Sequence, residues 1–371
     1  MKDFKKKHLL LVVLASLLFM GWGKDAHLII NGRTGLSFNG EMSYFLGWVD
    51  SLAAHASDAD YRKSWDPTED IKHYIDIDNY PSFVANGYII QDIDSLKMIH
   101  GAWFVENQGI LPWAILWTMD SIKAALGRGD FHRAMLHAAD LGHYVGDASM
   151  PLHITRNYNG QYTGQSGVHS RFESSMISRF KNEILFEGDS IEYIANKRDY
   201  VFSLLYENYK YVDSVLKSDS LAKAITGSTS NSAYYAAMWS YAKPFTVRLM
   251  KRASNSLAEL LYTVWVDAGR PLPLTAISSE LAEVKGFGLR QNYPNPFNPT
   301  TVIKYIIEMR GLVSLKIYDL SGREVSELIN KEMEEGEYTE KFDGSGLSSG
   351  VYFYQLETAG KREVRKMVLI K

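Results

Sequence analysis

His143-Tyr-Val-Gly-Asp147-Ala-Ser-Met-Pro-Leu-His153 brings two histidines and an aspartate into one short stretch. Positions four apart share a face of an α-helix, so His143 and Asp147 can offer a nitrogen and an oxygen to one metal ion. Pro151 ends the helix, because proline lacks the backbone N–H that a helix interior needs. His153 therefore leaves that helical face, which suits a ligand of a neighbouring ion.

Two further segments combine histidine with an acid. His169-Ser-Arg-Phe-Glu173 repeats the spacing of four, and His73-Tyr-Ile-Asp76 follows the acids Asp58 and Asp60. The chain has no cysteine, so a metal would be held by histidine, aspartate, glutamate or backbone atoms. One such pair is more often a simple surface pair. Three of them in a cysteine-free chain favour metal binding.

The composition is that of a globular protein with more than one domain. Of 371 residues, 46% are hydrophobic and 22% are charged, which is enough for two domains with sizeable cores. The formal net charge of −3 argues against a broad basic surface for duplex nucleic acid. The absence of cysteine also excludes a disulfide framework.

The N-terminus predicts a signal peptide over residues 1–21. Lysines at positions 2, 5, 6 and 7 precede an apolar run over 9–19. This run is shorter than the roughly 20 residues that cross a bilayer, and no later stretch is longer, so we expect an exported protein without a transmembrane span. An uncleaved N-terminal anchor is the alternative. Gly21 suits the last signal position, whereas Phe19 is a poor residue two positions before it.

Helical periodicity dominates residues 22–268, for which we expect a mainly α-helical domain. The clearest helical segments are 42–56, 110–126, 131–145, 200–216 and 232–266. Five of the ten prolines lie between residues 270 and 299, which places a linker at 269–286. Alternating runs then predict a small antiparallel β sandwich over 287–371, with strands at 301–308, 314–320, 338–342, 351–357 and 363–371.

The order of the candidate ligands resembles that of the zinc-dependent phospholipase C and single-strand-specific nuclease superfamily over residues 22–268. The spacings from His143 to His153 and from His169 to Glu173 fit that family without gaps. Ala59-Asp60-Tyr61 and His73-Tyr-Ile-Asp76 are similar to its motifs.

The resemblance implies three zinc ions per chain. The first would be held by Asp60, His73, His143 and Asp147. The second would be held by His153, His169 and Glu173. The third would be held by His27, by Asp147 as a bridge, and by the amine and carbonyl of an N-terminal Trp22, which requires signal cleavage between Gly21 and Trp22.

Two assignments within this set have alternatives. Asp58 lies fifteen and Asp60 thirteen residues before His73, and the Ala-Asp-Tyr setting of the family ligand favours Asp60. Clustered divalent ions lower the pKa of a bridging water and screen charge on phosphoryl oxygens. The resemblance suggests that Asp76 orients or deprotonates this water. Alternatively, Asp76 only fixes the ring of His73.

The resemblance implies hydrolysis of a phosphodiester, with a phospholipid head group or a single-stranded nucleic acid as substrate. Glu173 is similar to the phospholipase pattern, since the nucleases tend to carry aspartate there. The short spacing from Trp22 to His27 looks more like the nucleases. A zinc-stabilised binding protein without activity is a further alternative, but a structural zinc site has four protein ligands and the second ion here would have three.

The C-terminal segment resembles the sorting domain of the bacterial type IX secretion system. The resemblance is carried by Gln291-Asn-Tyr-Pro-Asn-Pro-Phe-Asn-Pro299, Ile317-Tyr-Asp-Leu-Ser-Gly-Arg323 and Ser349-Gly-Val-Tyr-Phe-Tyr354. It implies contact with the secretion machinery and a secreted or cell-surface location. A generic β adhesion module is the alternative.

Overall fold

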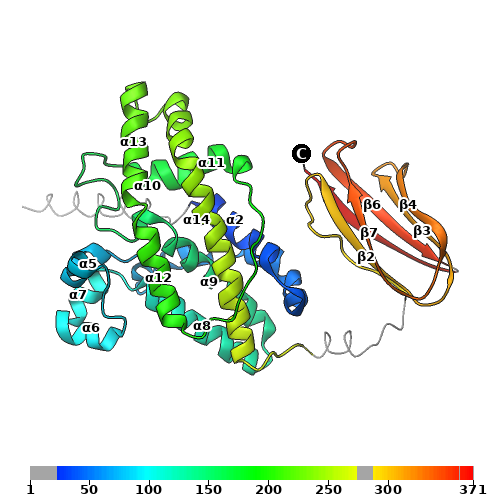
Figure 1. Cartoon of the computed structure of the whole chain (residues 1–371), viewed down its shortest axis with the longest axis horizontal. Coiled ribbons are helices and arrows are strands. Elements are labelled where there is room, and N and C mark those ends of the chain that lie inside the picture. Colours follow the sequence, from blue (N-terminus) through cyan, green and yellow to red (C-terminus); the bar gives the residue numbers. More distant parts are fainter. Residues whose placement is uncertain (1–22, 274–286, 359, 371) are drawn as a thin grey trace, which may run out of the picture. The chain divides into compact units, whose positions relative to one another are not determined.

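The chain forms two compact units, residues 1–273 and 274–371. We describe it from a computed structural model that covers residues 23–273, 287–358 and 360–370 (Figure 1). The signal peptide, Trp22 and most of the expected linker lie outside the described residues. The division falls inside the expected linker, and each unit is described by itself.

The first unit is built around α9 (Phe131–Ala148). The side chain of Asp130 accepts a hydrogen bond from the backbone N–H of Arg133 (3.0 Å) and so caps the start of this helix. Helices α2 (Lys24–Arg33), α8 (Leu111–Gly127) and α14 (Ser232–Asp267) all pack against α9. The C-terminal half of α9 is therefore buried from Leu141 to Ala148.

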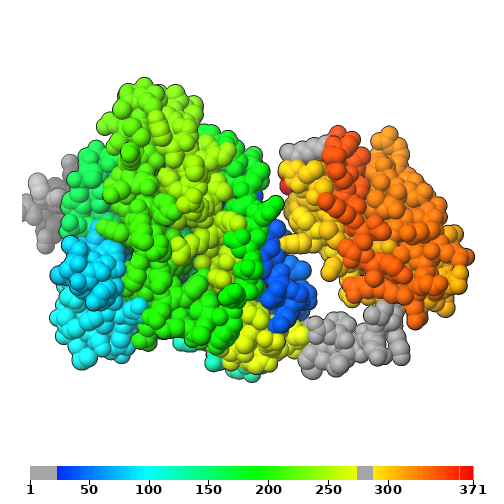
Figure 2. All heavy atoms as spheres, in the orientation of Figure 1, coloured from blue at the N-terminus to red at the C-terminus, as the bar shows by residue number. Residues whose placement is uncertain are grey.

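Shorter helices complete this unit, and the α5–α7 segment (cyan) lies at its surface (Figures 1 and 2). The remaining α-helices are α3 (Val49–Ala54), α4 (Asp58–Arg62), α5 (Pro81–Asn86), α6 (Ile93–His100), α7 (Ala102–Asn107), α10 (Val168–Ser170), α11 (Ile177–Phe180), α12 (Lys197–Tyr209) and α13 (Val212–Thr226). A π-helix, η6 (Arg171–Met176), continues α10. The 3-10 helices are η1 (Thr34–Ser37), η2 (Gly40–Trp48), η3 (Asp70–Lys72), η4 (Ile77–Asn79), η5 (Pro151–His153) and η7 (Lys181–Glu183). Within the described ranges, no helix is both long and apolar enough to span a bilayer.

Two predicted helices were wrong in detail. Segment 42–56 begins as the 3-10 helix η2 and becomes α-helical only in α3. Segment 200–216 is not one helix, because the chain breaks between α12 and α13. The two halves have different partners: α12 packs on α8, and α13 packs on α14. Asn208 anchors the end of α12 through a hydrogen bond from its Nδ2 to the backbone oxygen of Ala148 (2.9 Å).

The second unit is a two-sheet antiparallel β structure. One sheet has the order β1-β2-β5, and the other has the order β4-β3-β6-β7. The strands are β1 (Gly288–Leu289), β2 (Thr300–Ile307), β3 (Gly311–Asp319), β4 (Glu324–Met333), β5 (Gly336–Asp343), β6 (Gly350–Thr358) and β7 (Lys361–Leu369). Buried side chains of both sheets, among them Tyr305, Ile317 and Tyr354, form one core. The predicted fold class, a mainly α domain followed by a small all-β sandwich, is confirmed.

Strand β4 was not among the predicted strands. It lies at the edge of its sheet, and its register against β3 shifts between Leu315 and Lys316 and again between Ile317 and Tyr318. Most of its side chains are exposed or half-buried, so the strand shows no clean alternation of apolar and polar residues. The two-residue β1 was missed as well, because it is too short to show a period.

Candidate metal centre

The helical unit gathers the predicted ligands at its core. All eight that lie within the described residues are at most 9% exposed, and they come from elements far apart in the sequence. These residues are His27 on α2, Asp60 on α4, His73 after η3, His143 and Asp147 on α9, His153 on η5, His169 on α10 and Glu173 on η6. Trp22 falls outside the described residues.

The first cluster consists of Asp60, His73, His143 and Asp147. Nδ1 of His73 lies 2.9 Å from Oδ2 of Asp147 and 3.0 Å from Nε2 of His143. Nε2 of His143 lies 3.3 Å from the same Asp147 oxygen and 3.6 Å from Oδ1 of Asp60. One point is therefore surrounded by two imidazole nitrogens and two carboxylates.

The second cluster consists of His153, His169 and Glu173. The Nε2 atoms of His153 and His169 lie 3.2 Å apart. Oε2 of Glu173 lies 3.0 Å from Nε2 of His169 and 3.4 Å from Nε2 of His153. The other ring nitrogen of His153 lies 3.2 Å from Oδ1 of Asp147. Asp147 therefore joins the two clusters.

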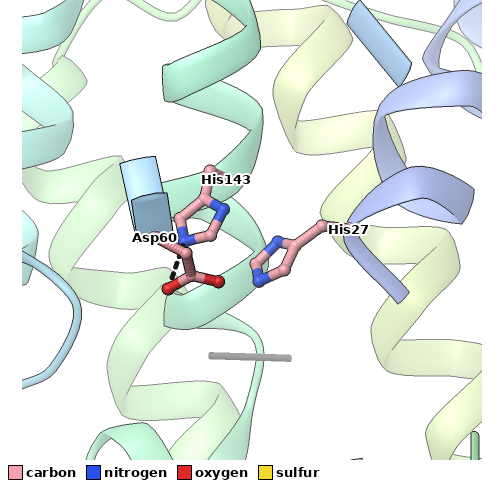
Figure 3. Close-up of side chains that lie close together, drawn as sticks. All are labelled: His27, Asp60 and His143. Carbon is pink, nitrogen blue, oxygen red and sulfur yellow. Dashed lines mark ion pairs between the residues drawn. The ribbon is translucent and has the colours of Figure 1, made fainter. Parts of the chain in front are cut away.

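His27 approaches the first cluster from α2. Its ring stacks on that of His143 with 3.8 Å between centroids, and its Nε2 lies 3.5 Å from Oδ1 of Asp147. Figure 3 shows the imidazoles of His27 and His143 next to each other, with the Asp60 carboxylate close to the His143 ring. One ligand atom from each of these three residues lies within 4.8 Å of the other two. Neither ring nitrogen of His27 has a hydrogen-bond partner among the described residues.

The donor set fits divalent cations. Nδ1 of His143 lies 2.7 Å from the backbone oxygen of Ala56, and Nδ1 of His169 lies 3.0 Å from that of Tyr158. A ring that donates through Nδ1 leaves a lone pair on Nε2, which is the usual arrangement of a metal-binding histidine. Within the part of the chain that the structure describes, Oδ1 of Asp147 and Oε2 of Glu173 are buried without a hydrogen-bond partner. Buried polar atoms of this kind need a partner, and a metal ion supplies one.

The electrostatic environment of the two clusters favours positive charge. Burial alone would lower the pKa of His153, but the carboxylates of Asp147 and Glu173 raise it to about 10. Burial alone would raise the pKa of Asp60, but His143 and Lys63 bring it down to about 2. The carboxylates of Asp60 and Asp147, whose pKa values are both lowered, are therefore ionised at neutral pH and attract a cation.

A pocket of about 270 Å³ opens onto both clusters. Its lining includes His73, His153, His169 and Asp76. Burial raises the pKa of Asp76 to about 7, with a further rise from Asp78, while Arg156 opposes it. The backbone N–H of Asp76 donates to the backbone oxygen of Gln108 (2.7 Å), which holds the residue at the pocket wall.

The structure separates the two candidate aspartates. Asp60 lies in the first cluster, with Nζ of Lys63 2.8 Å from its Oδ1. Asp58 instead pairs with His55, whose Nδ1 is 2.7 Å from Oδ2 of Asp58, and both side chains are about 40% exposed. Asp58 therefore faces away from the cluster.

Sequence reasoning missed Glu69. This side chain is 1% exposed, and its Oε1 lies 3.5 Å from Nε2 of His73. The spacing from Glu69 to His73 is four, the same as that of the pairs His143/Asp147 and His169/Glu173. This spacing could have identified Glu69 from the sequence, as a residue that lies beside the candidate ligand His73.

Comparison with known proteins defines the C-terminal unit. Residues 291–371 match the family described as the secretion system C-terminal sorting domain. The predicted sorting domain is thus confirmed, and it supports export through a type IX system to the cell surface or beyond. Contact with that machinery follows from the same domain.

The chain is also similar to one curated protein and to two solved structures. It is 25% identical over 204 residues to a probable serine protease from Bradyrhizobium tropiciagri, a match over 47% of this chain and 26% of that protein. The chain thus spans about a quarter of the length of that relative. Two solved structures are similar: alpha-toxin from Clostridium absonum (12% identity, TM-score 0.41, 94% of this chain and 96% of that one) and alpha-toxin from an avian strain of Clostridium perfringens (13%, 0.42, 93% and 96%).

Proposed function

We propose that the helical unit is a zinc-dependent phosphodiester hydrolase, most similar in action to phospholipase C, that is exported with the help of its C-terminal domain. The observation that carries this proposal is the meeting of eight buried His, Asp and Glu side chains, three of which, His73, His153 and His169, line one pocket. Such a set combines binding of several cations with access for a substrate.

The proposed ligand sets follow the clusters. Asp60, His73, His143 and Asp147 hold one zinc, and His153, His169 and Glu173 hold a second. His27 and Asp147 contribute to a third. The amine and carbonyl of Trp22 complete the proposed ligands of the third zinc.

The position of Gly23 supports the role of Trp22. Gly23 is buried, and a Cβ added to it would lie 2.9 Å from Cα of Ser174, the residue after Glu173. Gly23 therefore lies beside the segment that carries Glu173, and the proposed Trp22 ligand precedes it directly in the sequence.

N-terminal sequencing of the secreted protein tests this point. We expect the mature chain to begin at Trp22, because only cleavage after Gly21 frees the amine that the third zinc needs. A variant with one alanine inserted after Gly21 should lose about one zinc per chain if cleavage still occurs at the same bond. A mature chain that begins at any other residue contradicts the assignment.

In the proposed reaction, the bound zinc ions and Asp76 would have different roles. Bound zinc ions would supply an activated water and screen the charge of the phosphoryl oxygens. Asp76, a pocket-lining carboxyl with a pKa near 7, would accept the proton of the attacking water. The carboxylate next to Nε2 of His73 is that of Glu69 and not that of Asp76. This supports proton transfer as the role of Asp76 over fixing the ring of His73.

A single-strand-specific nuclease is the second candidate function. Glu173 favours a phospholipase, and the short spacing from Trp22 to His27 favours a nuclease. Tyr74 and Tyr158 line the pocket, and an aromatic ring can pack on a quaternary ammonium head group or stack on a base. A binding protein without activity is a lesser candidate, because its zinc sites would be closed, whereas the second cluster has three protein ligands beside the pocket.

Metal analysis combined with substrate assays tests the proposal. We expect about three zinc ions per mature chain, hydrolysis of phosphatidylcholine, and loss of both after treatment with a chelator. Cleavage of single-stranded DNA or RNA in its place would select the nuclease candidate. Zinc-loaded protein that hydrolyses no phosphodiester would leave only the binding candidate.

A further inference from the structure

A group of charged and polar side chains lies beside His73 of the first cluster. Oε1 of Glu69 is 3.2 Å from a guanidinium nitrogen of Arg62, and its Oε2 is 2.8 Å from Nζ of Lys72. The hydroxyl of Tyr144 donates to Oε1 of Glu69. Arg62 also pairs with Asp140 (2.9 Å). We call these five residues the Glu69 network.

The Glu69 network touches every element that carries a ligand of the first cluster. Arg62 ends α4, two residues after Asp60. Glu69 precedes η3 and comes four residues before His73. Asp140 and Tyr144 belong to α9, next to His143. The network therefore ties α4 and the segment around η3 to α9, which is distant from both in the sequence.

The ring of His73 shows what this network can do. A neutral imidazole has one donor nitrogen and one acceptor nitrogen. Nδ1 faces the first cluster, whereas Nε2 is buried and makes no hydrogen bond to any other described residue. The nearest charged group to Nε2 is Glu69, at 3.5 Å. A carboxylate in this position keeps the proton on Nε2 and leaves the lone pair of Nδ1 free for a metal ion.

We propose that Glu69 is the positioning residue of the first cluster: it holds the donor nitrogen of His73 and so presents Nδ1 as the metal-binding atom. Arg62, Lys72 and Tyr144 in turn hold Glu69. This inference rests on the proposed zinc binding and adds a residue that touches neither metal nor substrate.

Glu69→Gln tests the proposal, because glutamine keeps the shape of the side chain and removes its charge. We expect zinc at the first cluster to bind about 10- to 100-fold more weakly in this variant. Zinc at the second cluster should bind as in the wild type, since none of its ligands contacts Glu69. Affinities are measured by competition with a chromophoric chelator, starting from metal-free protein. The conservative variant Glu69→Asp, which keeps the charge, should recover part of the loss.

Glu106→Gln is the matched control. Glu106 pairs with Lys97 (2.7 Å), and its side chain is 49% exposed, so we expect wild-type zinc affinity. If Glu69→Gln does not fold, Tyr144→Phe carries the test, because it removes one hydrogen bond to Glu69 and leaves His73 untouched. We expect a severalfold weaker first-cluster zinc in Tyr144→Phe.

The melting temperature of the metal-free protein separates positioning from a merely structural role. A structural role lowers this temperature and leaves the zinc affinity of the folded protein unchanged, and that result overturns the proposal. Equal weakening of both clusters overturns it as well. If the wild type itself takes up no zinc, the proposed function fails first, and the wild-type titration shows this directly.

Discussion

Asp147 is the residue on which the most contacts of the site converge. Its Oδ2 faces His73 and His143, whereas its Oδ1 faces His27 at 3.5 Å and His153 at 3.2 Å. The side chain is fully buried, so water cannot replace any of these partners. Nearby histidines hold the pKa of this carboxyl well below its usual range although burial alone would raise it. The carboxylate is therefore a permanent negative charge between two candidate ions.

Asp147→Asn should abolish nearly all activity. Loss of a group beside a ligand typically costs about 10- to 100-fold, and loss of a charge shared by two ions costs more than that. We expect a fall in kcat/KM well beyond about 100-fold, together with a lower zinc content. Asp58→Asn is the control, because Asp58 lies outside the clusters and should behave as the wild type. Full zinc content and activity in Asp147→Asn would mean that Asp147 bridges nothing.

The pH dependence of activity tests Asp76. Its pKa is raised to about 7, so the residue is protonated below this pH and ionised above it. A general base works only when ionised, and we therefore expect kcat/KM to rise with pH through about 7. Asp76→Asn should lose about 10²- to 10⁴-fold in kcat/KM and lack this rise. Asp70→Asn, which changes another carboxyl of the pocket lining, should retain it. An unchanged pH profile in Asp76→Asn would assign the rise to another group.

At the scale of elements, α9 contributes His143 and Asp147, and helices α2 and α14 pack very closely against it. Gly142, one residue before His143, is a point of close contact with α2 and α14. A Cβ at this position would lie 2.2 Å from Oδ1 of Asn31 and 2.7 Å from Cδ2 of Leu257. Asn31 cannot move aside easily, since its Nδ2 donates to the backbone oxygens of Leu52 (3.0 Å) and Ala139 (3.1 Å). The small residue therefore sets the distance between α2 and α9, and with it the approach of His27.

Gly142→Ala should destabilise the helical unit. Alanine gains about 1 kcal/mol of helix propensity over glycine, but overpacking of a tight contact costs about 1–3 kcal/mol and a strained Asn31 adds to this. We expect a net loss of about 1–2 kcal/mol in urea unfolding. Gly127→Ala on α8 is the matched control, because a Cβ there meets nothing within 4 Å, and it should be neutral or stabilising. Equal stability of Gly142→Ala and the wild type would show that α2 can shift without cost.

At the scale of the whole molecule, the two units have separate tasks. The candidate metal groups found among the described residues all belong to the helical unit. The β unit has its own core and carries the match to the sorting domain. Zinc binding should therefore stabilise one unit and leave the other unaffected.

Removal of zinc should shift one of two unfolding transitions. A ligand at 100 times its Kd stabilises the folded state by about 2.7 kcal/mol, which corresponds to about 5–10 °C in a unit of this size. We expect a chelator to lower the melting temperature of the helical unit by at least this amount, with recovery when zinc is added back. The transition of the β unit, followed in the same calorimetric scan, should not move. A shift of both transitions would contradict the separation of the units.

Local spacing was enough to predict much of this protein. The pairs His143/Asp147 and His169/Glu173 could be found because helical neighbours are determined by a period of 3.6 residues, which needs no tertiary contact. The helices at 110–126, 131–145 and 232–266 follow from the same helical period, and strands β2, β3, β5, β6 and β7 follow from a local alternation of apolar and polar residues. The sorting domain could be recognised because its motif is continuous in the sequence.

Only the tertiary structure decided how distant segments combine. The spacing to His73 left Asp58 and Asp60 open, and the fold brings Asp60 alone into the first cluster. The break between α12 and α13 follows from their different partners, which no local period records. Glu69 acquires its place through contacts with α4 and α9, because a buried charge must find partners wherever the fold offers them. Sequence determines which groups are available along each element, and packing determines which of them share one site.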